Sequence, residues 1–197
     1  MTAQAFQTAL ARLIVEPEFR DAVRAGGSAA LPGELTPREA WRLATIAGDR
    51  GLDMNRTLHK GFRLGKLRAL LPLTCAALTP ARLAREVAQF WRANPPASFS
   101  FLPEALEFCA FLERRGLRSV YLAEVLAFER ATLELERARV GAPPPQSVRF
   151  RHDPVSLLGA LAEGRRPRSV RARPCLLLGS KDADAPTRWT LVDAVSR

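Results

Sequence analysis

Two histidines, His59 and His152, are the first residues to weigh for chemistry, and they lie far apart in the chain. A catalytic metal site usually needs three or more His, Asp, Glu or Cys ligands. No HxxxH, CxxC or HxD spacing occurs, so the sequence predicts no self-contained metal centre. His59 is expected on an exposed helix face. His152 ends a predicted strand, where a hydrogen bond that fixes the corner is favoured over a catalytic role.

The three cysteines, Cys75, Cys109 and Cys175, are widely spaced, and each lies within an apolar run. This pattern favours buried, reduced and unreactive thiols, as in a cytoplasmic protein. The motifs GxGxxG, GxxxxGK[ST] and GxSxG are also absent from the sequence, and with them the usual signatures of dinucleotide binding, P-loop phosphate binding and serine hydrolysis. We therefore expect no covalent chemistry from this chain alone, and a stand-alone enzyme is the least favoured class.

Glu129 is the one carboxylate that the helical pattern places among apolar residues. At 100° per residue it falls in the middle of a stripe formed by Leu122, Val125, Leu126 and Leu133. A buried carboxylate must be paired, hydrogen-bonded or protonated, because burying it alone costs several kcal/mol. No second chemical group lies nearby in sequence. The pattern favours a structural carboxylate, paired with an arginine of a neighbouring helix, over a catalytic acid or base.

Helices and short loops account for residues 1–140, which we expect to form an all-α bundle. Thr36, Pro37 and Glu39 form a capping box with proline at the first helical position. Thr79 before Pro80 predicts another helix start, and Pro72 ends or kinks the helix before it. Ser100 is the expected cap of the first of two long amphipathic helices, between residues 99 and 139, around which the rest of the chain is organised.

The pattern changes after the linker Gly141–Pro145, which cannot continue a helix. Val148, Phe150 and His152 alternate with polar residues, as in a half-buried strand. A short helix is predicted from Pro154, and further strands over residues 174–179 and 187–195. The predicted fold class is therefore α+β, with a helical, partner-docking domain at 1–140 and a small module with a short antiparallel sheet at 146–197.

A net charge of +10 predicts an acidic partner, and five arginines lie between Arg165 and Arg173 without an intervening acid. This arginine tract has three interpretations: a solvated loop, a phosphate contact, or a dock for an acidic peptide or protein. Nucleic acid is disfavoured, since neither the aromatics of an RNP-type sheet nor a helix-turn-helix is evident. The N-terminus lacks a signal-peptide pattern, and the longest apolar run is too short to span a bilayer, so we expect a cytoplasmic protein without a membrane partner.

Three passages resemble one known family in their order and spacing: RALLPLTCAAL, LAREVAQFWRANPPASFSFLPEALEFCAFL, and YLAEVLAFERATLELERAR followed by RFRHDP. From about Leu67 onward, the chain resembles the MbnC-type proteins of methanobactin and related ribosomal-peptide biosynthesis. The resemblance implies a non-catalytic subunit that forms a heterodimer with a TIM-barrel, multinuclear non-haem iron oxygenase. It also implies binding of a precursor peptide by its leader, whose cysteines the pair oxidises to oxazolone–thioamide groups. The iron would belong to the partner, and no cofactor to this chain.

Capture of the leader by strand addition at an exposed sheet edge fits both the resemblance and the predicted module. The candidate edges are 147–152, 174–179 and 187–192. The residues expected to bind the peptide include four apolar anchors, for which a core role is the alternative, and three arginines that could contact leader carboxylates. Together with His152, the candidates are Phe150, Leu176, Leu178, Trp189, Arg171, Arg173 and Arg188. The alternative function is an arginine-rich, nucleic-acid-binding regulator.

Overall fold

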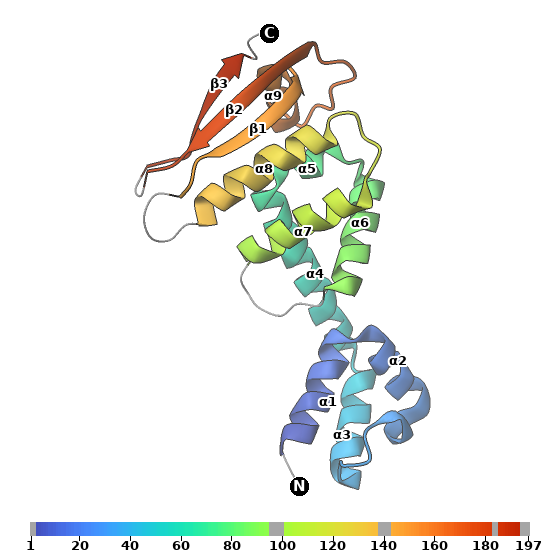
Figure 1. Ribbon diagram of the computed structural model, residues 1–197. Coiled ribbons are helices and arrows are strands. Elements are labelled where there is room, and N and C mark those ends of the chain that lie inside the picture. Colours follow the sequence, from blue (N-terminus) through green and yellow to red (C-terminus); the bar gives the residue numbers. More distant parts are fainter. Residues whose placement is uncertain (1–2, 95–100, 138–142, 183–184, 194–197) are drawn as a thin grey trace. The chain divides into compact units, whose positions relative to one another are not determined.

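The computed structural model describes residues 3–94, 101–137, 143–182 and 185–193 (Figure 1). The chain divides into two compact units, Met1–Arg63 and Leu64–Arg197. The predicted cap at Ser100 lies outside the described residues. No helix in the described ranges is both long and apolar enough to cross a membrane.

The first unit is a small helical cluster with its own core. Its elements are α1 (Ala3–Val15), α2 (Pro17–Gly26), the 3-10 helix η1 (Gly27–Ala30), α3 (Pro37–Gly48) and the start of α4 (Arg50–Leu70). The predicted capping box of α3 is confirmed: Thr36 Oγ1 accepts from the Glu39 amide at 3.3 Å, and the Glu39 carboxylate accepts from the Thr36 amide at 2.9 Å. The core consists of Ala9, Leu13, Val23, Leu31, Leu43 and Ala47.

The second unit contains a helical layer and a sheet. After the end of α4 come α5 (Pro72–Ala77), α6 (Pro80–Ala93), α7 (Phe101–Arg115) and α8 (Leu122–Arg137). Pro72 therefore both follows the long helix and opens the next one, at a first helical position where its missing N–H has no cost. Phe90 of α6 packs on Phe108 and Phe111 of α7, with ring centroids 5.1 and 5.6 Å apart. These aromatic contacts anchor the helical core.

The α+β class is confirmed by a three-stranded antiparallel sheet near the C-terminus. Its strands are β1 (Gln146–His152), β2 (Ala172–Ser180) and β3 (Arg188–Asp193), in the order β1-β2-β3, and α9 (Pro154–Ala162) follows β1. Because β2 pairs with a strand on each side, residues 174–179 are not an exposed edge, which corrects one of the three edges expected from the sequence. The edges are β1 and β3.

One face of the sheet is covered by α8 and α9. Val148, Phe150, Cys175 and Leu177 point to this face and pack in one buried cluster with Val125 of α8. Leu157 and Leu161 of α9 complete the cluster, and Trp189 and Leu191 of β3 lie partly buried against it. The alternation predicted for 148–152 is thus confirmed, because Val148 and Phe150 are buried in this core and His152 is partly buried, whereas Arg149 and Arg151 between them are exposed.

The division into units differs from the boundary expected at the proline-rich linker, because α8 belongs to two cores at once. Its residues Leu122, Leu126 and Leu133 pack into the helical core, whereas Val125 and Ala131 pack under the sheet. A helix that is apolar on most of its circumference must be covered on several sides. The sheet module is therefore part of the same unit as α5 to α8, and the boundary lies near residue 63.

Glu129 of α8 is buried, as its place on the helical wheel predicted, but its partner differs from the expected arginine. Its carboxylate accepts hydrogen bonds from the backbone amides of Leu73 and Thr74, at 2.7 and 2.6 Å. These amides belong to the first turn of α5, which has no side-chain cap of its own. A negative charge suits a helix N-terminus. Glu129 thus caps a helix from 55 residues away in sequence.

This capping role predicts a pH dependence. Burial raises the pKa of Glu129, and hydrogen bonding with Thr74 and Leu73 only partly opposes that effect. An acid whose pKa is raised on folding binds more protons in the folded state, so its contribution to stability increases as the pH falls from the folded pKa towards the unfolded one. The difference in unfolding free energy between the wild type and Glu129→Gln should therefore shift in favour of the wild type on acidification. Chemical denaturation from pH 7 down to pH 4.5 measures it, and a difference independent of pH would contradict the raised pKa.

All three cysteines are free and buried, as expected. Burial raises the pKa of Cys75 and of Cys109 to about 12, and the pKa of Cys175 is also raised, mainly by burial. The thiolate is the reactive form of cysteine. Near neutral pH these three side chains therefore behave as small hydrophobic residues.

Candidate functional site

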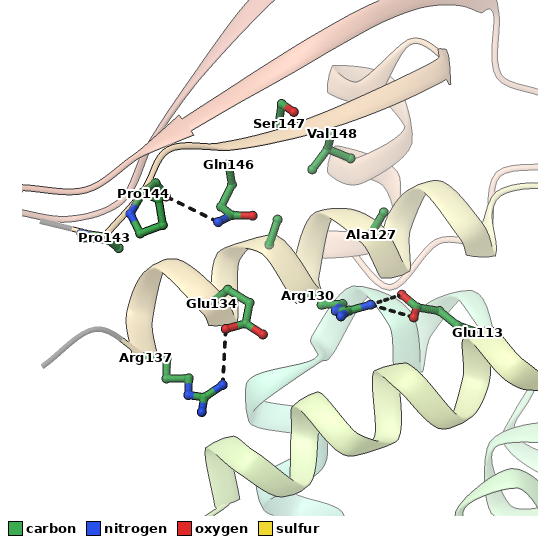
Figure 2. A pocket seen from close by; sticks show the side chains of 11 residues that line it. Glu113, Ala127, Arg130, Glu134, Arg137, Pro143, Pro144, Gln146, Ser147 and Val148 are labelled. Carbon is green, nitrogen blue, oxygen red and sulfur yellow. Dashed lines mark hydrogen bonds and ion pairs between the residues drawn. The ribbon is translucent and has the colours of Figure 1, made fainter.

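A cleft of about 670 Å³ lies between the start of β1 and the helices α7 and α8 (Figure 2). Helix α8 forms most of its floor, and Glu113 of α7 and the segment leading into β1 form its sides. The lining residues are Glu113, Ala127, Arg130, Ala131, Glu134, Arg137, Pro143, Pro144, Gln146, Ser147 and Val148. Because β1 is an edge strand of the sheet and lies nearest to α8 (Figure 1), this cleft borders an edge of the sheet.

The far end of the β1 edge is closed by Glu124 of α8. Its Oε2 accepts from the amides of Arg151 and His152, at 3.0 and 3.2 Å. The pairing of β1 with β2 also shifts in register between Phe150 and His152. In a regular strand consecutive amides point to opposite edges, so it is the register shift that lets the side chain of Glu124 accept from both amides here. Pairing with a further strand is consequently restricted to the part of β1 beside the cleft, Gln146 to Phe150.

His152 helps to hold this corner, as its position in the sequence predicted. Its Nδ1 lies 2.7 Å from Oε1 of Glu124, and its ring packs edge-on against Tyr121 with centroids 4.9 Å apart. The Tyr121 hydroxyl accepts a hydrogen bond from the Val170 amide at 3.0 Å. These contacts join α8, the end of β1 and the segment before β2. His152 therefore positions backbone, and its Nδ1 is already engaged.

The charges that line the cleft are paired with one another. Nη1 of Arg130 donates to both carboxylate oxygens of Glu113, at 2.9 and 2.7 Å, and this hydrogen bonding raises the pKa of Arg130. Arg137 lies 3.6 Å from Glu134 one turn earlier on α8. All four side chains remain partly exposed. The floor thus offers both signs of charge to a ligand, next to the apolar side chains of Ala127 and Val148 (Figure 2).

The residues predicted to bind peptide do not converge on one place. Phe150 is 2% exposed and belongs to the core, and Trp189 lies half-buried with its ring 4.9 Å from that of Phe128. Leu176 and Leu178, in contrast, lie on the face of the sheet away from α8 and α9. For two of the four proposed anchors the core alternative therefore holds.

The three predicted arginine contacts differ in availability. Arg173 is bound to two carboxylates, Asp153 at 3.2 Å and Asp193 at 2.8 Å, and this hydrogen bonding raises its pKa. Arg171 and Arg188 are exposed. Of the arginine tract, Arg166 donates to the carbonyls of Ala76 and Leu78 at the end of α5 and Arg165 pairs with Glu163. Three of the five arginines in the tract thus have partners within the chain.

Sequence reasoning missed the residues that form the cleft and its closed end. Arg130 and Glu134 follow the pattern of an exposed helix face, and Glu124 lies on the side of α8 opposite the stripe that contains Glu129, so the helical wheel did not single out any of them. Glu86 of α6 was missed in the same way, although its side chain is fully buried between Arg85 and Arg115. The one available signal was the proline-rich segment immediately before the first strand, which brings Pro143 and Pro144 to the cleft.

No group of three or more His, Cys, Asp or Glu side chains with the spacing of a metal site occurs among the described residues. Neither the comparison with protein-family models nor the comparison with curated proteins gave a match. The geometry of the second unit is therefore the basis on which a function can be argued.

Proposed function

We propose that this chain is the non-catalytic, peptide-binding subunit of a heterodimeric, iron-dependent peptide-modifying oxygenase. The observation that carries the proposal is the free stretch of β1 beside the cleft. The sequence resemblance to MbnC-type proteins supports the same function and supplies the class of partner and substrate. In this proposal the iron belongs to the TIM-barrel partner, and the substrate is a precursor peptide whose cysteines become oxazolone–thioamide groups. The two subunits act in the cytoplasm.

The free stretch of β1 suits strand addition. An extended leader segment that pairs with Gln146–Phe150 would form main-chain hydrogen bonds over about five residues, or roughly 17 Å. Every second side chain of the added strand would face α8 and enter the cleft. There it would contact the Arg130–Glu113 and Arg137–Glu134 pairs. Every second residue of the leader segment, the one that faces the cleft floor, should therefore be polar or charged.

Blocking the cleft should weaken leader binding without unfolding the chain. Glu134→Trp places a large side chain on the floor, at a partly exposed helical position that lines the cleft. We expect the dissociation constant for the precursor's leader peptide to increase by at least about tenfold, which corresponds to about 1.4 kcal/mol. Fluorescence anisotropy with the labelled leader measures this change. The matched control is Glu107→Trp, at an exposed position of α7 that does not line the cleft.

The contribution of main-chain hydrogen bonds to leader binding is tested by modifying the backbone of the leader peptide. Leader peptides N-methylated at alternate residues lose the donors of one edge, so one of the two methylation patterns should weaken binding and the other should not. Equal effects of both patterns, or wild-type affinity in Glu134→Trp, would contradict strand addition at β1. Co-expression with the iron oxygenase encoded beside this gene, followed by size-exclusion chromatography and iron analysis, tests the heterodimer itself.

The alternative function, a nucleic-acid-binding regulator, can be tested because part of the arginine tract is exposed. Arg168 and Arg171 of the arginine tract are exposed. A regulator that contacts several phosphates should lose orders of magnitude in affinity for random duplex DNA between low and moderate salt. The regulator function would replace the proposal if the purified chain bound DNA in this way and the oxygenase were fully active in the absence of the chain.

A further inference from the structure

The face of the sheet opposite α8 and α9 has a short apolar row along its centre. Leu176 and Leu178 of β2 point to this face, and Val192 lies directly beside Leu176 in the register of β2 and β3. Leu178 is 42% exposed and Val192 is 40% exposed. The opposite face buries its apolar residues under two helices, so this row is the part of the sheet that remains open to another layer.

The apolar row is flanked by positive charge on both sides. Arg149 lies beside Leu176 on β1, and Arg151 occupies the next outward position of the same strand. Arg188 of β3 lies beside Ser180, next to Leu178 along β2. The three guanidinium groups are exposed and form no ion pair within the described residues. Among the described residues of the three strands, the outward positions hold no aspartate or glutamate.

We propose that this open sheet face is a docking surface for an acidic amphipathic helix of another protein. A helix is the element that commonly covers a sheet face, with its apolar stripe on the sheet. Adjacent strands lie about 4.8 Å apart, so the three strand axes span roughly 10 Å, which matches the 10–12 Å diameter of one helix. A helix along β2 would place its apolar stripe on the Leu176–Leu178 row. Carboxylates on its two flanks would meet Arg149 and Arg151 on one side and Arg188 on the other.

The size and the chemistry of the face distinguish this occupant from others. β3 has six residues, or about 20 Å, so the face measures roughly 10 by 20 Å, well below the ~800 Å² per partner of a standard protein interface. A single helix of about 13 residues covers that length. A single-stranded nucleic acid would favour aromatic side chains for base stacking, and the outward positions of the described strands hold none. The docking surface does not depend on the oxygenase partnership.

Designed peptides provide the first test. The probe is an 18-residue helix with leucine on one stripe and glutamate on both flanks. Its controls are a peptide of identical composition with scrambled order, and a helix with lysine in place of each glutamate. We expect the acidic helix to bind the full chain at least about tenfold more tightly than the scrambled peptide, because a net charge of +10 attracts any acidic peptide but only an apolar stripe matches the row. The lysine helix should bind most weakly.

Two variants locate the binding on this face. Leu178→Thr combined with Val192→Thr removes exposed apolar surface but retains good strand formers, and should remove the preference for the acidic helix over its scrambled form. Arg149→Glu combined with Arg188→Glu should make the lysine helix the tighter ligand. Binding of the leader at β1 should be unchanged in the variant with Leu178→Thr and Val192→Thr, because both substitutions lie outside Gln146–Phe150. The proposal is overturned if the acidic helix and its scrambled form bind the wild type equally, or if random duplex DNA binds through these arginines while neither peptide does.

Discussion

Replacing Glu129 by leucine is expected to lower the free energy of unfolding by about 3 kcal/mol. The side chain accepts from the amides of Leu73 and Thr74 at 2.7 and 2.6 Å, and leucine cannot accept either bond. A buried donor left without a partner costs about 1–3 kcal/mol, and the replacement leaves the buried amide of Thr74 and the part-buried amide of Leu73 without this acceptor. Leucine avoids the desolvation of a carboxylate, which places the expected loss in the lower half of the summed range.

Urea unfolding followed by circular dichroism measures the loss, and Glu134→Leu is its control on the same helix. Glu134 is partly exposed and lies 3.6 Å from its only ion-pair partner among the described residues, Arg137, so its replacement should change the unfolding free energy by less than about 0.5 kcal/mol. If Glu129→Leu were as stable as this control, the capping of α5 by Glu129 would contribute nothing measurable.

Replacing Gly179 is expected to give the second large loss of stability, because the indole of Trp189 occupies the space that a side chain at position 179 would need. A Cβ at this position would lie 2.7 Å from two ring atoms of Trp189 and 3.0 Å from Cδ1 of Leu135. Gly179 and Trp189 are register partners in β2 and β3, so the ring covers the glycine from the neighbouring strand. Gly179→Ala should destabilise the second unit by about 2 kcal/mol, as overpacking of a filled core does.

Gly159→Ala is the opposing control for this prediction. Gly159 lies within α9, and a Cβ there has no atom within 4 Å. Alanine in a helix interior is favoured over glycine by about 0.5–1 kcal/mol, so this variant should be more stable than the wild type. Thermal or chemical denaturation of the two variants should thus give opposite signs, and a neutral Gly179→Ala would show that Trp189 has another position available.

Local patterns in the sequence were sufficient for most of the secondary structure. The capping box at Thr36, the helix start at Thr79, the alternation of β1 and the short helix from Pro154 are all features of a few neighbouring residues, and the structure contains each of them. The burial of Glu129 was also predictable, because it follows from the position of one residue on one helix.

The sites depended on contacts between distant segments. The cleft requires α7, α8 and the start of β1 to meet, and Glu124 reaches amides that lie 27 and 28 residues away. Sequence periodicity gives the face of an element but not the element that the face will meet. The order of the strands was equally undetermined, so the central position of β2 could not be distinguished from an edge.

The sequence by itself thus determined the α+β class, the positions of most elements and the buried state of Glu129 and the cysteines, because hydrogen-bonding caps and apolar periodicity act within one element. Only the tertiary structure decided that the N-terminus of α5 is the partner of Glu129, that β1 borders the cleft, and that Leu178 and Val192 lie on an open face between arginines. Each of these depends on which elements pack together. Helix α8 is central to that packing, because its apolar residues belong to both the helical core and the core under the sheet.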